Sequence, residues 1–331
     1  MNPLTYTLMN APMPPPGPLS PLPGRWGQAL VRPECVLATC AGDIYTADWR
    51  GGVAHQRPDG SQTLYRAQGL DLRPNGIALL ADGSFLIAHL GAEDGGVFRL
   101  MRDGHAEPWL IEVDGVALPP TNFALRGGGG AIWITVSTRL KPRALGYRKT
   151  CDDGFIVRVD ERGARIAADG LGYTNEVAEH GGFLYVNETF GRRLSRFAIR
   201  ADGTLGAKEV VTTFGAGTFP DGLAFDEEGQ AWVVSIVSNR LIRVAPDGAQ
   251  RVWLEDADPA HLAWVEAAFE SGTMGREHLD RAAGRTLKNI SSIAFCGVDR
   301  REALLGCLLG DSLVRVRMPV AGVAPAHWKD A

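Results

Sequence analysis

Hydrophobic residues recur along this chain in short runs of four or five, and turn-forming residues separate the runs. The clearest unit opens at Pro220, Asp221 and Gly222, continues through strand-like runs at 231–234 and 240–244, and ends at a Pro-Asp-Gly turn at 246–248. Short β-type runs separated by glycine-containing turns are typical of an antiparallel meander. The pattern therefore predicts a chain built from repeated β-meanders.

The meander occurs six times along the chain. Its copies open at Glu34, Asn75, Asn122, Asn175, Asp221 and Ser291, in steps of 41, 47, 53, 46 and 70 residues. Periods in the forties with about four strands each are the mark of propeller blades. One blade cannot bury both of its faces, whereas blades stacked in a closed ring can. We therefore predict an all-β fold, a six-bladed β-propeller, in which residues 26–31 supply an outer strand that closes the ring against the last blade.

The rest of the chain predicts one tail and two insertions. Residues 1–24 contain eight prolines and are expected to form a proline-rich N-terminal tail. Residues 25–331 are expected to form the single propeller. The two longest repeats carry insertions at about 137–153, which is basic, and at 255–288, where apolar residues follow Asp258-Pro259 at helical spacing. Both insertions are expected to cover one end of the central channel.

Composition excludes several classes of protein. The 34 basic and 38 acidic residues leave a net charge of −4 and no basic block, so a nucleic-acid partner is not expected. No apolar run approaches the ~18 residues that a membrane span requires, and the N-terminus does not resemble a signal peptide. The five cysteines are scattered without CxxC spacing, which favours reduced thiols and a cytoplasmic location over disulfides or a zinc site.

The opening residues of the six repeats are the candidate chemistry. In a propeller the innermost strand of each blade begins at the channel axis, so these side chains can point into one central space. Five of the six are carboxylates or carboxamides, and none is histidine or cysteine. Oxygen ligands suit a hard divalent ion such as Ca²⁺, Mg²⁺ or Mn²⁺, whose charge Glu34 and Asp221 would neutralise. The sequence thus predicts a central metal-binding channel.

A simpler reading is open for two of these positions. Asn75-Gly76 and Asp221-Gly222 are also typical of turns that open a strand. That reading predicts no particular residue where glycine is absent. Glu34, Asn122 and Asn175 keep an oxygen-bearing side chain without the glycine, which favours a site for the set as a whole.

Three segments resemble a known family. RPNGIALLADGSFLIAHLG (73–91), YTNEVAEHGGFLYVNETFGRRLSRF (173–197) and FPDGLAFDEEGQAWVV (219–234), with Pro-Glu at 33–34, are similar to the senescence marker protein/gluconolactonase/luciferin-regenerating enzyme family. The similarity covers about residues 25–318. It implies a six-bladed propeller with one divalent metal ion in its channel and hydrolysis of lactones. Diisopropyl fluorophosphatase and strictosidine-synthase-like proteins share this architecture, so the fold alone does not fix the reaction.

The resemblance also implies roles for single residues. Glu34, Asn175 and Asp221 would be the metal ligands, and Asn122 would be a fourth ligand or would contact bound water or substrate. Calcium is the preferred ion, with Mn²⁺, Mg²⁺, Zn²⁺ and Fe²⁺ as alternatives. Two departures weaken the match to sugar lactones. Pro120 stands where sugar-lactone hydrolases often have arginine, and Glu176 stands where glycine is usual.

These observations predict a metal-dependent hydrolase that opens a lactone with activated water. Asp221 is the expected general base, and Asn122 is expected to act beside it. Substrate contacts are assigned to Asn75, Asn122, His89, Arg143 and Glu176. The basic insertion, with Arg139, Lys141, Arg143, Arg148 and Lys149, would supply a cationic contact to an acidic substrate that need not be a sugar lactone. Trp264 and Phe269 are expected to exclude water.

Two alternatives stay open at this point. One is a non-enzymatic propeller that binds a ligand or protein and needs no ion. The other is a metal-dependent phosphotriesterase or esterase on the same scaffold. The expected partner is a small lactone or ester, and the chain is expected to be a monomer or a small homo-oligomer.

Overall fold

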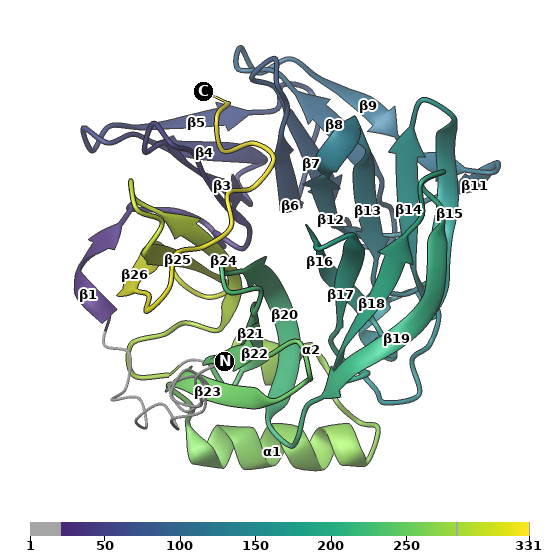
Figure 1. Cartoon of the computed structure of the whole chain (residues 1–331), viewed down its shortest axis with the longest axis vertical. Helices are drawn as coiled ribbons and strands as arrows, with labels where there is room; N and C mark the ends of the chain where they lie inside the picture. The colour runs from purple at the N-terminus through teal and green to yellow at the C-terminus, as the bar shows by residue number, and fades with distance from the viewer. Residues whose placement is uncertain (1–20, 283, 331) are drawn as a thin grey trace, which may run out of the picture.

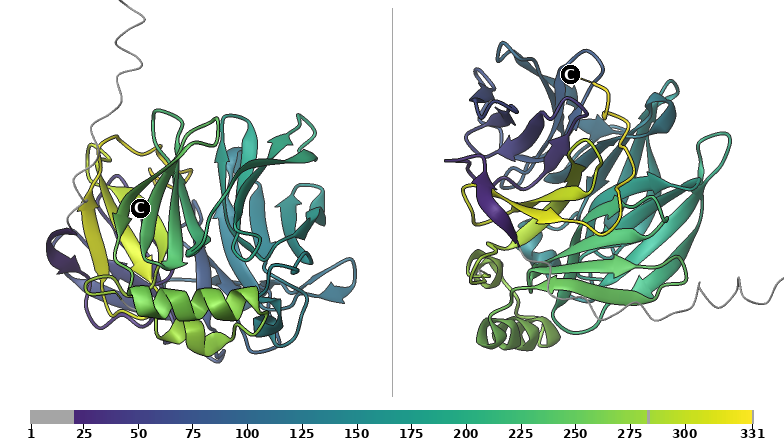
Figure 2. Two further views of the ribbon diagram at one scale, coloured as in Figure 1. Left: turned by 90° about the horizontal axis from the view of Figure 1, so that it is seen from below. Right: turned by 60° about the vertical axis from the view of Figure 1, so that its left-hand side comes forward.

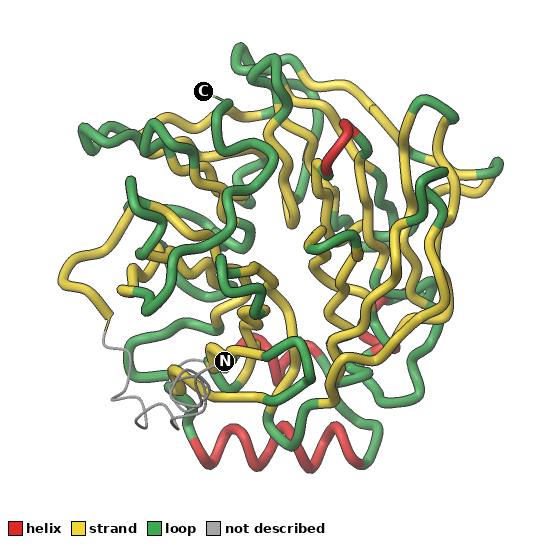
Figure 3. The backbone as a smooth tube through the Cα atoms, in the orientation of Figure 1, coloured by secondary structure: helices red, strands yellow, loops and turns green. Residues whose placement is uncertain are grey.

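The computed structural model describes residues 21–282 and 284–330, and its strands are arranged in a ring about a central axis (Figure 1). Within these residues the strands form six four-stranded antiparallel sheets and one two-stranded hairpin. Figure 3 shows the strands of the ring joined by loops, with the longest helix at one side. The predicted six-bladed β-propeller is confirmed.

Four consecutive strands make up each of the first five blades. Blade 1 contains β2 (Val36–Ala38), β3 (Ile44–Asp48), β4 (Gly52–Gln56) and β5 (Gln62–Arg66). Blade 2 contains β6 (Pro74–Leu79), β7 (Phe85–His89), β8 (Val97–Leu100) and β9 (Ala106–Leu110). After the hairpin of β10 (Glu112–Val113) and β11 (Val116–Ala117), blade 3 contains β12 (Thr121–Arg126), β13 (Ile132–Val136), β14 (Gly154–Asp160) and β15 (Gly163–Leu171).

The chain continues in the same order around the ring. Blade 4 contains β16 (Thr174–His180), β17 (Phe183–Glu188), β18 (Arg193–Ile199) and β19 (Leu205–Thr213). Blade 5 contains β20 (Thr218–Phe225), β21 (Ala231–Val237), β22 (Arg240–Val244) and β23 (Gln250–Glu255). The first strand of each blade is the innermost, so β2, β6, β12, β16 and β20 lie around the central axis together with β24 (Ile290–Cys296).

The sixth blade joins the two ends of the chain. Its strands β24 (Ile290–Cys296), β25 (Glu302–Cys307) and β26 (Leu313–Arg317) come from the C-terminal part, and β1 (Pro21–Trp26) adds its outer strand by antiparallel pairing with β26. The sequence predicts this closing strand at 26–31 and assigns residues 21–24 to the tail. Both boundaries are wrong, because the strand ends at Trp26. The rest of the predicted tail, residues 1–20, lies outside the described residues.

Both insertions lie at one end of the ring. Residues 137–153 form an irregular segment with one 3₁₀ turn at Arg143–Gly146. Residues 255–288 contain α1 (Pro259–Glu270) and α2 (Arg276–Asp280), which lie together beneath the blades (Figure 2, left). Helix α1 starts where the sequence predicts, because the Asp258 side chain accepts hydrogen bonds from the amides of Ala260 and His261. No helix in the described part of the chain is long and apolar enough to span a bilayer.

The hydrophobic core lies between neighbouring blades. Trp133, Trp232 and Phe85 are among the largest side chains that are fully buried there. Each such side chain contributes roughly 1.5–3 kcal/mol through its removal from water. The packing is close enough that two channel-side glycines are required. A Cβ on Gly76 would lie 2.5 Å from the Phe123 Cα, and one on Gly222 would lie 2.6 Å from the Ser291 carbonyl oxygen.

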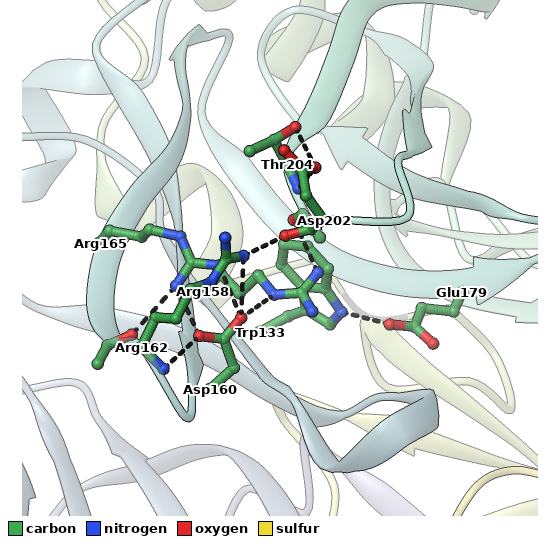
Figure 4. A network of polar contacts seen from close by, with 10 residues as sticks. Trp133, Arg158, Asp160, Arg162, Arg165, Glu179, Asp202 and Thr204 are labelled. Atoms are coloured by element: carbon green, nitrogen blue, oxygen red, sulfur yellow. Dashed lines mark hydrogen bonds and ion pairs between the residues drawn. The ribbon is translucent and has the colours of Figure 1, made fainter.

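A polar network fixes blades 3 and 4 to each other at the rim (Figure 4). At the turn between β14 and β15, the Asp160 carboxylate accepts hydrogen bonds from Arg165 and Arg158 at 2.6–2.8 Å. These bonds hold the pKa of Asp160 well below its usual range. Arg158 also donates to the carbonyl of Gly203 in the next blade, and the Trp133 indole donates to Glu179. The network is structural, because it lies on the blade edges and none of these residues lines the cavity around the predicted site.

The far end of the channel is covered by the C-terminal segment. Residues 323–327 and the inner strands enclose a cavity of about 380 Å³ with mostly apolar walls. His327 lines this cavity and is buried, and its Nε2 has no hydrogen-bond partner among the described residues. Burial, with repulsion from Arg126, lowers the pKa of His327 to about 4.

Candidate metal centre and its arginine cluster

The innermost strands share an irregularity that positions the predicted site. In blades 2 to 6 the pairing of the first two strands shifts register at the start of the inner strand, as at a β-bulge. The shifts contain Asn75, Asn122, Asn175, Asp221 and Ser291. A bulge turns a side chain out of the regular alternation of a strand, and bulges are frequent beside binding sites. The opening residue of each repeat is thereby turned out of the sheet pattern.

The two Asn-Gly and Asp-Gly pairs are not turns. Asn75-Gly76 lies inside β6 and Asp221-Gly222 lies inside β20. Neither glycine is among those with positive φ in the described residues. The glycines are needed for the close approach of adjacent inner strands, so neither pair forms a turn at its strand entry.

One small cavity brings together five of the predicted site residues. It has a volume of about 20 Å³ and is lined by Glu34, Asn122, Asn175, Asp221 and Arg143. Arg32, Tyr147, Tyr173, Thr189, Phe190 and Arg276 complete its polar and aromatic walls. A volume of this size holds about one ion or one water molecule. Arg32, Arg276 and Leu308 also line an adjoining surface groove of about 1010 Å³.

The side-chain amide of Asn175 has a fixed orientation. Its Nδ2 donates to the Thr189 hydroxyl oxygen at 3.0 Å, and the Thr189 hydroxyl donates to the Pro220 carbonyl at 2.8 Å. Because the threonine proton is already used, Thr189 can only accept from Asn175. The Oδ1 of Asn175 is buried and has no hydrogen-bond partner among the described residues.

Asn122 is arranged in the same way. Its Nδ2 donates to the Ser137 hydroxyl at 3.0 Å, and its Oδ1 is also buried without a partner among the described residues. A buried polar atom that lacks a hydrogen bond costs about 1–3 kcal/mol, so two in one cavity require an explanation. Both oxygens have free lone pairs, and a cation could bind to them.

The two carboxylates differ in their surroundings. Glu34 accepts a hydrogen bond from the Arg32 guanidinium at 2.9 Å, and both side chains are buried. Burial, together with repulsion from Glu34 and Glu176, raises the pKa of Asp221 well above its usual range. In the absence of a cation, two such groups side by side favour proton uptake over a second negative charge.

Three predicted substrate contacts do not line the cavity. Asn75 lies behind it, where its Oδ1 faces Arg32 at 3.4 Å and its Nδ2 donates to the Asn122 carbonyl at 3.0 Å. Glu176 points to the opposite side, toward the cavity at the far end, and accepts a hydrogen bond from the Leu223 amide at 2.9 Å. Burial raises the pKa of Glu176 to about 8.

His89 also lies outside the cavity lining. Its Nδ1 accepts a hydrogen bond from the Arg73 amide at 2.9 Å, and its Nε2 lies 3.4 Å from Asp94. The two aromatic residues that the sequence assigns to water exclusion are not cavity-lining either. Phe269 is buried against Phe190, and Trp264 is partly exposed and stacks on His278.

Arg143 is the only basic residue of the described segment 137–153 that lines the cavity. Its Nε donates to the Tyr173 hydroxyl at 2.8 Å, while its Nη1 is buried without a partner in the described chain. Arg139 pairs with Asp169, and Lys149 pairs with Glu270, both at the surface.

Sequence reasoning missed Arg32 and Arg276. Arg32 comes two residues before Glu34 and has a positive φ of 52°, which no local pattern indicates. Arg276 starts α2 and reaches the cavity only because the second insertion folds back over the ring. Both arginines have an ion-pair partner nearby in the sequence, but the cavity that they line is assembled from distant blades.

The residues present fit a divalent ion. Two carboxylates and two amide oxygens without partners converge on a space that one ion fills. Within the described residues no group of three or more His, Cys, Asp or Glu side chains is placed to hold a metal ion. The candidate set contains only two carboxylates, so its other ligands would be the amide oxygens of Asn122 and Asn175.

Part of the chain matches a known family model. Residues 124–265 match the family model described as the SMP-30/Gluconolactonase/LRE-like region. A 6-deoxy-6-sulfogluconolactonase from Pseudomonas putida is 29% identical over 248 residues, which are 67% of this chain and 76% of that protein.

Solved structures share the fold. A calcium-binding protein, regucalcin, from Agrobacterium tumefaciens superposes with a TM-score of 0.67 and 17% identity over 96% of this chain and all of its own. A gluconolactonase from Xanthomonas campestris superposes with a TM-score of 0.64 and 18% identity, over 93% of this chain and 99% of its own. A luciferin-regenerating enzyme superposes with a TM-score of 0.65 and 16% identity, over 95% of this chain and 100% of its own. The family resemblance drawn from the sequence is confirmed: this chain contains an SMP-30/gluconolactonase/LRE-like region within a six-bladed propeller.

Proposed function

We propose that this protein is a metal-dependent hydrolase that opens a lactone. The observation that carries the proposal is the convergence of Glu34 and Asp221 with the two unpartnered amide oxygens of Asn122 and Asn175. The gluconolactonase-type relative and the family match support lactone hydrolysis as the reaction.

Glu34, Asn175 and Asp221 would hold the ion, with Asn122 as a fourth ligand. When bound, a divalent ion would polarise the lactone carbonyl and make water more acidic. Oxygen ligands favour a hard ion, and Ca²⁺ is our first choice. The charges of Glu34 and Asp221 would balance the ion, which removes the reason for Asp221 to take up a proton.

Asp221 is the proposed general base. Its carboxylate accepts a proton from water as the water oxygen bonds to the lactone carbonyl carbon. The ring C–O bond then breaks, and the proton is returned to the ring oxygen, which leaves as an alcohol. Asn122 would orient the substrate or water beside Asp221, since both line the same cavity.

The substrate would enter from the adjoining groove, because the cavity itself is too small for a sugar ring. We propose that the lactone is acidic, since three arginines line the cavity and the named relative acts on a sulfonated lactone. We also propose a cytoplasmic location, which the five free cysteines favour.

Metal content and turnover test the proposal together. The purified, dialysed protein should contain about one divalent ion per chain by elemental mass spectrometry, and the Asp221→Ala variant should contain none. With its metal, the wild type should release acid from glucono-1,5-lactone or 6-deoxy-6-sulfogluconolactone in a pH-stat, and the variant should not. No bound metal after incubation with each of Ca²⁺, Mn²⁺, Mg²⁺, Zn²⁺ and Fe²⁺ would exclude this function.

A further inference from the structure

The arginines around the cavity differ in how their charges are matched. Arg32 pairs with Glu34 at 2.9 Å, and Arg276 pairs with Asp280 at 2.8 Å. Arg143 forms no ion pair among the described residues, although it lies inside the same cavity. A half-buried guanidinium that lacks a carboxylate is costly, and proteins seldom retain one without a use.

The guanidinium of Arg143 is held in place by aromatic side chains. Its Nε donates to the Tyr173 hydroxyl at 2.8 Å, and its central carbon lies 5.5 Å from the centre of the Tyr173 ring. Tyr173 in turn packs edge-on against Tyr147 and Phe190. This arrangement leaves Nη1 buried, unpartnered in the described chain and fixed in direction.

Arg276 extends the positive charge to the mouth of the cavity. It lines both the cavity and the adjoining groove, and it interacts with the hydroxyl of Tyr147. The three guanidinium groups repel one another, since the charges of Arg143 and Arg276 each act to lower the pKa of Arg32. Three guanidiniums therefore lie within electrostatic range of one another, and two of them, Arg32 and Arg276, also line the groove.

The charge balance changes once an ion is bound. Three arginines face Glu34, Asp221 and Asp280, so the side chains are neutral in sum when all three carboxylates are ionised. A divalent ion on Glu34 and Asp221 adds two positive charges. The loaded cavity would then carry an excess of two positive charges, which a neutral lactone cannot balance.

We propose that Arg143 and Arg276 form a subsite for an anionic oxygen group on the substrate, of which a sulfonate is the type we would test. The inference rests on the proposed function for the identity of the ring, but the subsite itself is a property of this chain without metal. It makes Arg143 the residue that determines specificity. The reacting ring would lie toward Asp221, and its anionic substituent would lie toward the two insertions.

Binding to the metal-free protein tests the subsite apart from any hydrolysis. The probes are methyl 6-deoxy-6-sulfoglucoside and methyl glucoside, which differ in the anionic group and contain no lactone. By isothermal titration calorimetry the wild type should bind the sulfonate at least tenfold more tightly, since charge-assisted hydrogen bonds are the strong ones. Arg143→Gln should lose this difference, and Arg143→Lys should keep part of it.

Lys141→Gln is the matched control. It removes one positive charge from the same insertion, at an exposed position that does not line the cavity. It should behave as the wild type, and thermal melts should confirm that every variant is folded. Equal binding of the two probes by the wild type would overturn the subsite, as would a preference that survives Arg143→Gln. Neither result would affect the metal and ring-opening measurements, so the two proposals can fail separately.

Discussion

The Thr189 hydroxyl accepts a hydrogen bond from the side-chain amide of Asn175 at 3.0 Å and donates one to the Pro220 carbonyl at 2.8 Å. This arrangement decides which end of the Asn175 amide faces the cavity. Residues that orient a ligand in this way typically change metal affinity by 10- to 100-fold when they are altered.

Thr189→Val should therefore weaken metal binding by about 10- to 100-fold, because valine has the same shape but accepts no hydrogen bond. Calorimetric titration of the metal-free protein with Ca²⁺ measures the change. Thr135→Val is the control, since Thr135 is buried in β13 and its hydroxyl has no partner among the described residues. An unchanged Ca²⁺ affinity in Thr189→Val would show that Asn175 does not need the hydrogen bond to Thr189 for metal binding.

Asn175→Leu should separate the binding role of this residue from a structural one. Leucine removes a buried acceptor that lacks a partner, so the metal-free variant should be as stable as the wild type or more stable by about 1 kcal/mol. Its metal affinity should fall at least tenfold. Urea unfolding with and without Ca²⁺ checks both. A metal-free variant destabilised by more than about 2 kcal/mol would indicate that the amide serves the fold instead.

Gly222→Ala should destabilise the ring by about 3 kcal/mol, because its Cβ would lie 2.6 Å from backbone atoms of Ser291 and Ser292 in the next blade. Neither backbone position can move without displacing β24. Gly215→Ala is the matched control, since nothing lies within 4 Å of the corresponding Cβ. Thermal unfolding compares the two, and equal melting temperatures would show that the inner strands tolerate separation.

His327 should make the protein less stable in mild acid. Its pKa is lowered to about 4 in the folded protein, against an ordinary value near 6.5. A histidine with a lowered folded-state pKa contributes stability above pH 6.5, and this is lost as the pH falls toward 4. The loss is about 3 kcal/mol across that range.

Replacement of the titrating ring tests this dependence. His327→Gln should flatten the decline of the melting temperature between pH 7 and pH 4.5, whereas His105→Gln, at an exposed position, should not. Parallel curves for the wild type and His327→Gln would exclude His327 as the source of acid sensitivity.

The sequence predicts the ring and the oxygen-bearing residues of the cavity, but not the residues that surround them. The repeat spacing and the residues that open each repeat predict six blades and place Glu34, Asn122, Asn175 and Asp221 together, as the structure has them. Thr189 and Arg276 could not be predicted, because they reach the cavity from a neighbouring strand end and from an irregular insertion. The closing strand was misplaced because a strand that pairs only at a ring edge needs no alternating pattern of its own. Its ladder partner is β26, almost 300 residues away.

The union of β1 with β26 has a consequence for how the protein is made. Glu34 is anchored by the last blade, since the Pro33 carbonyl accepts a hydrogen bond from the Cys307 amide at 2.9 Å and the Glu34 carbonyl accepts one from Ser291. During translation at about 5–20 residues per second, tens of seconds separate the synthesis of these partners. Until the last blade has been synthesised, the ring cannot close and Glu34 lacks these two backbone anchors. The cavity that Glu34 lines is therefore complete only after the final strands have emerged.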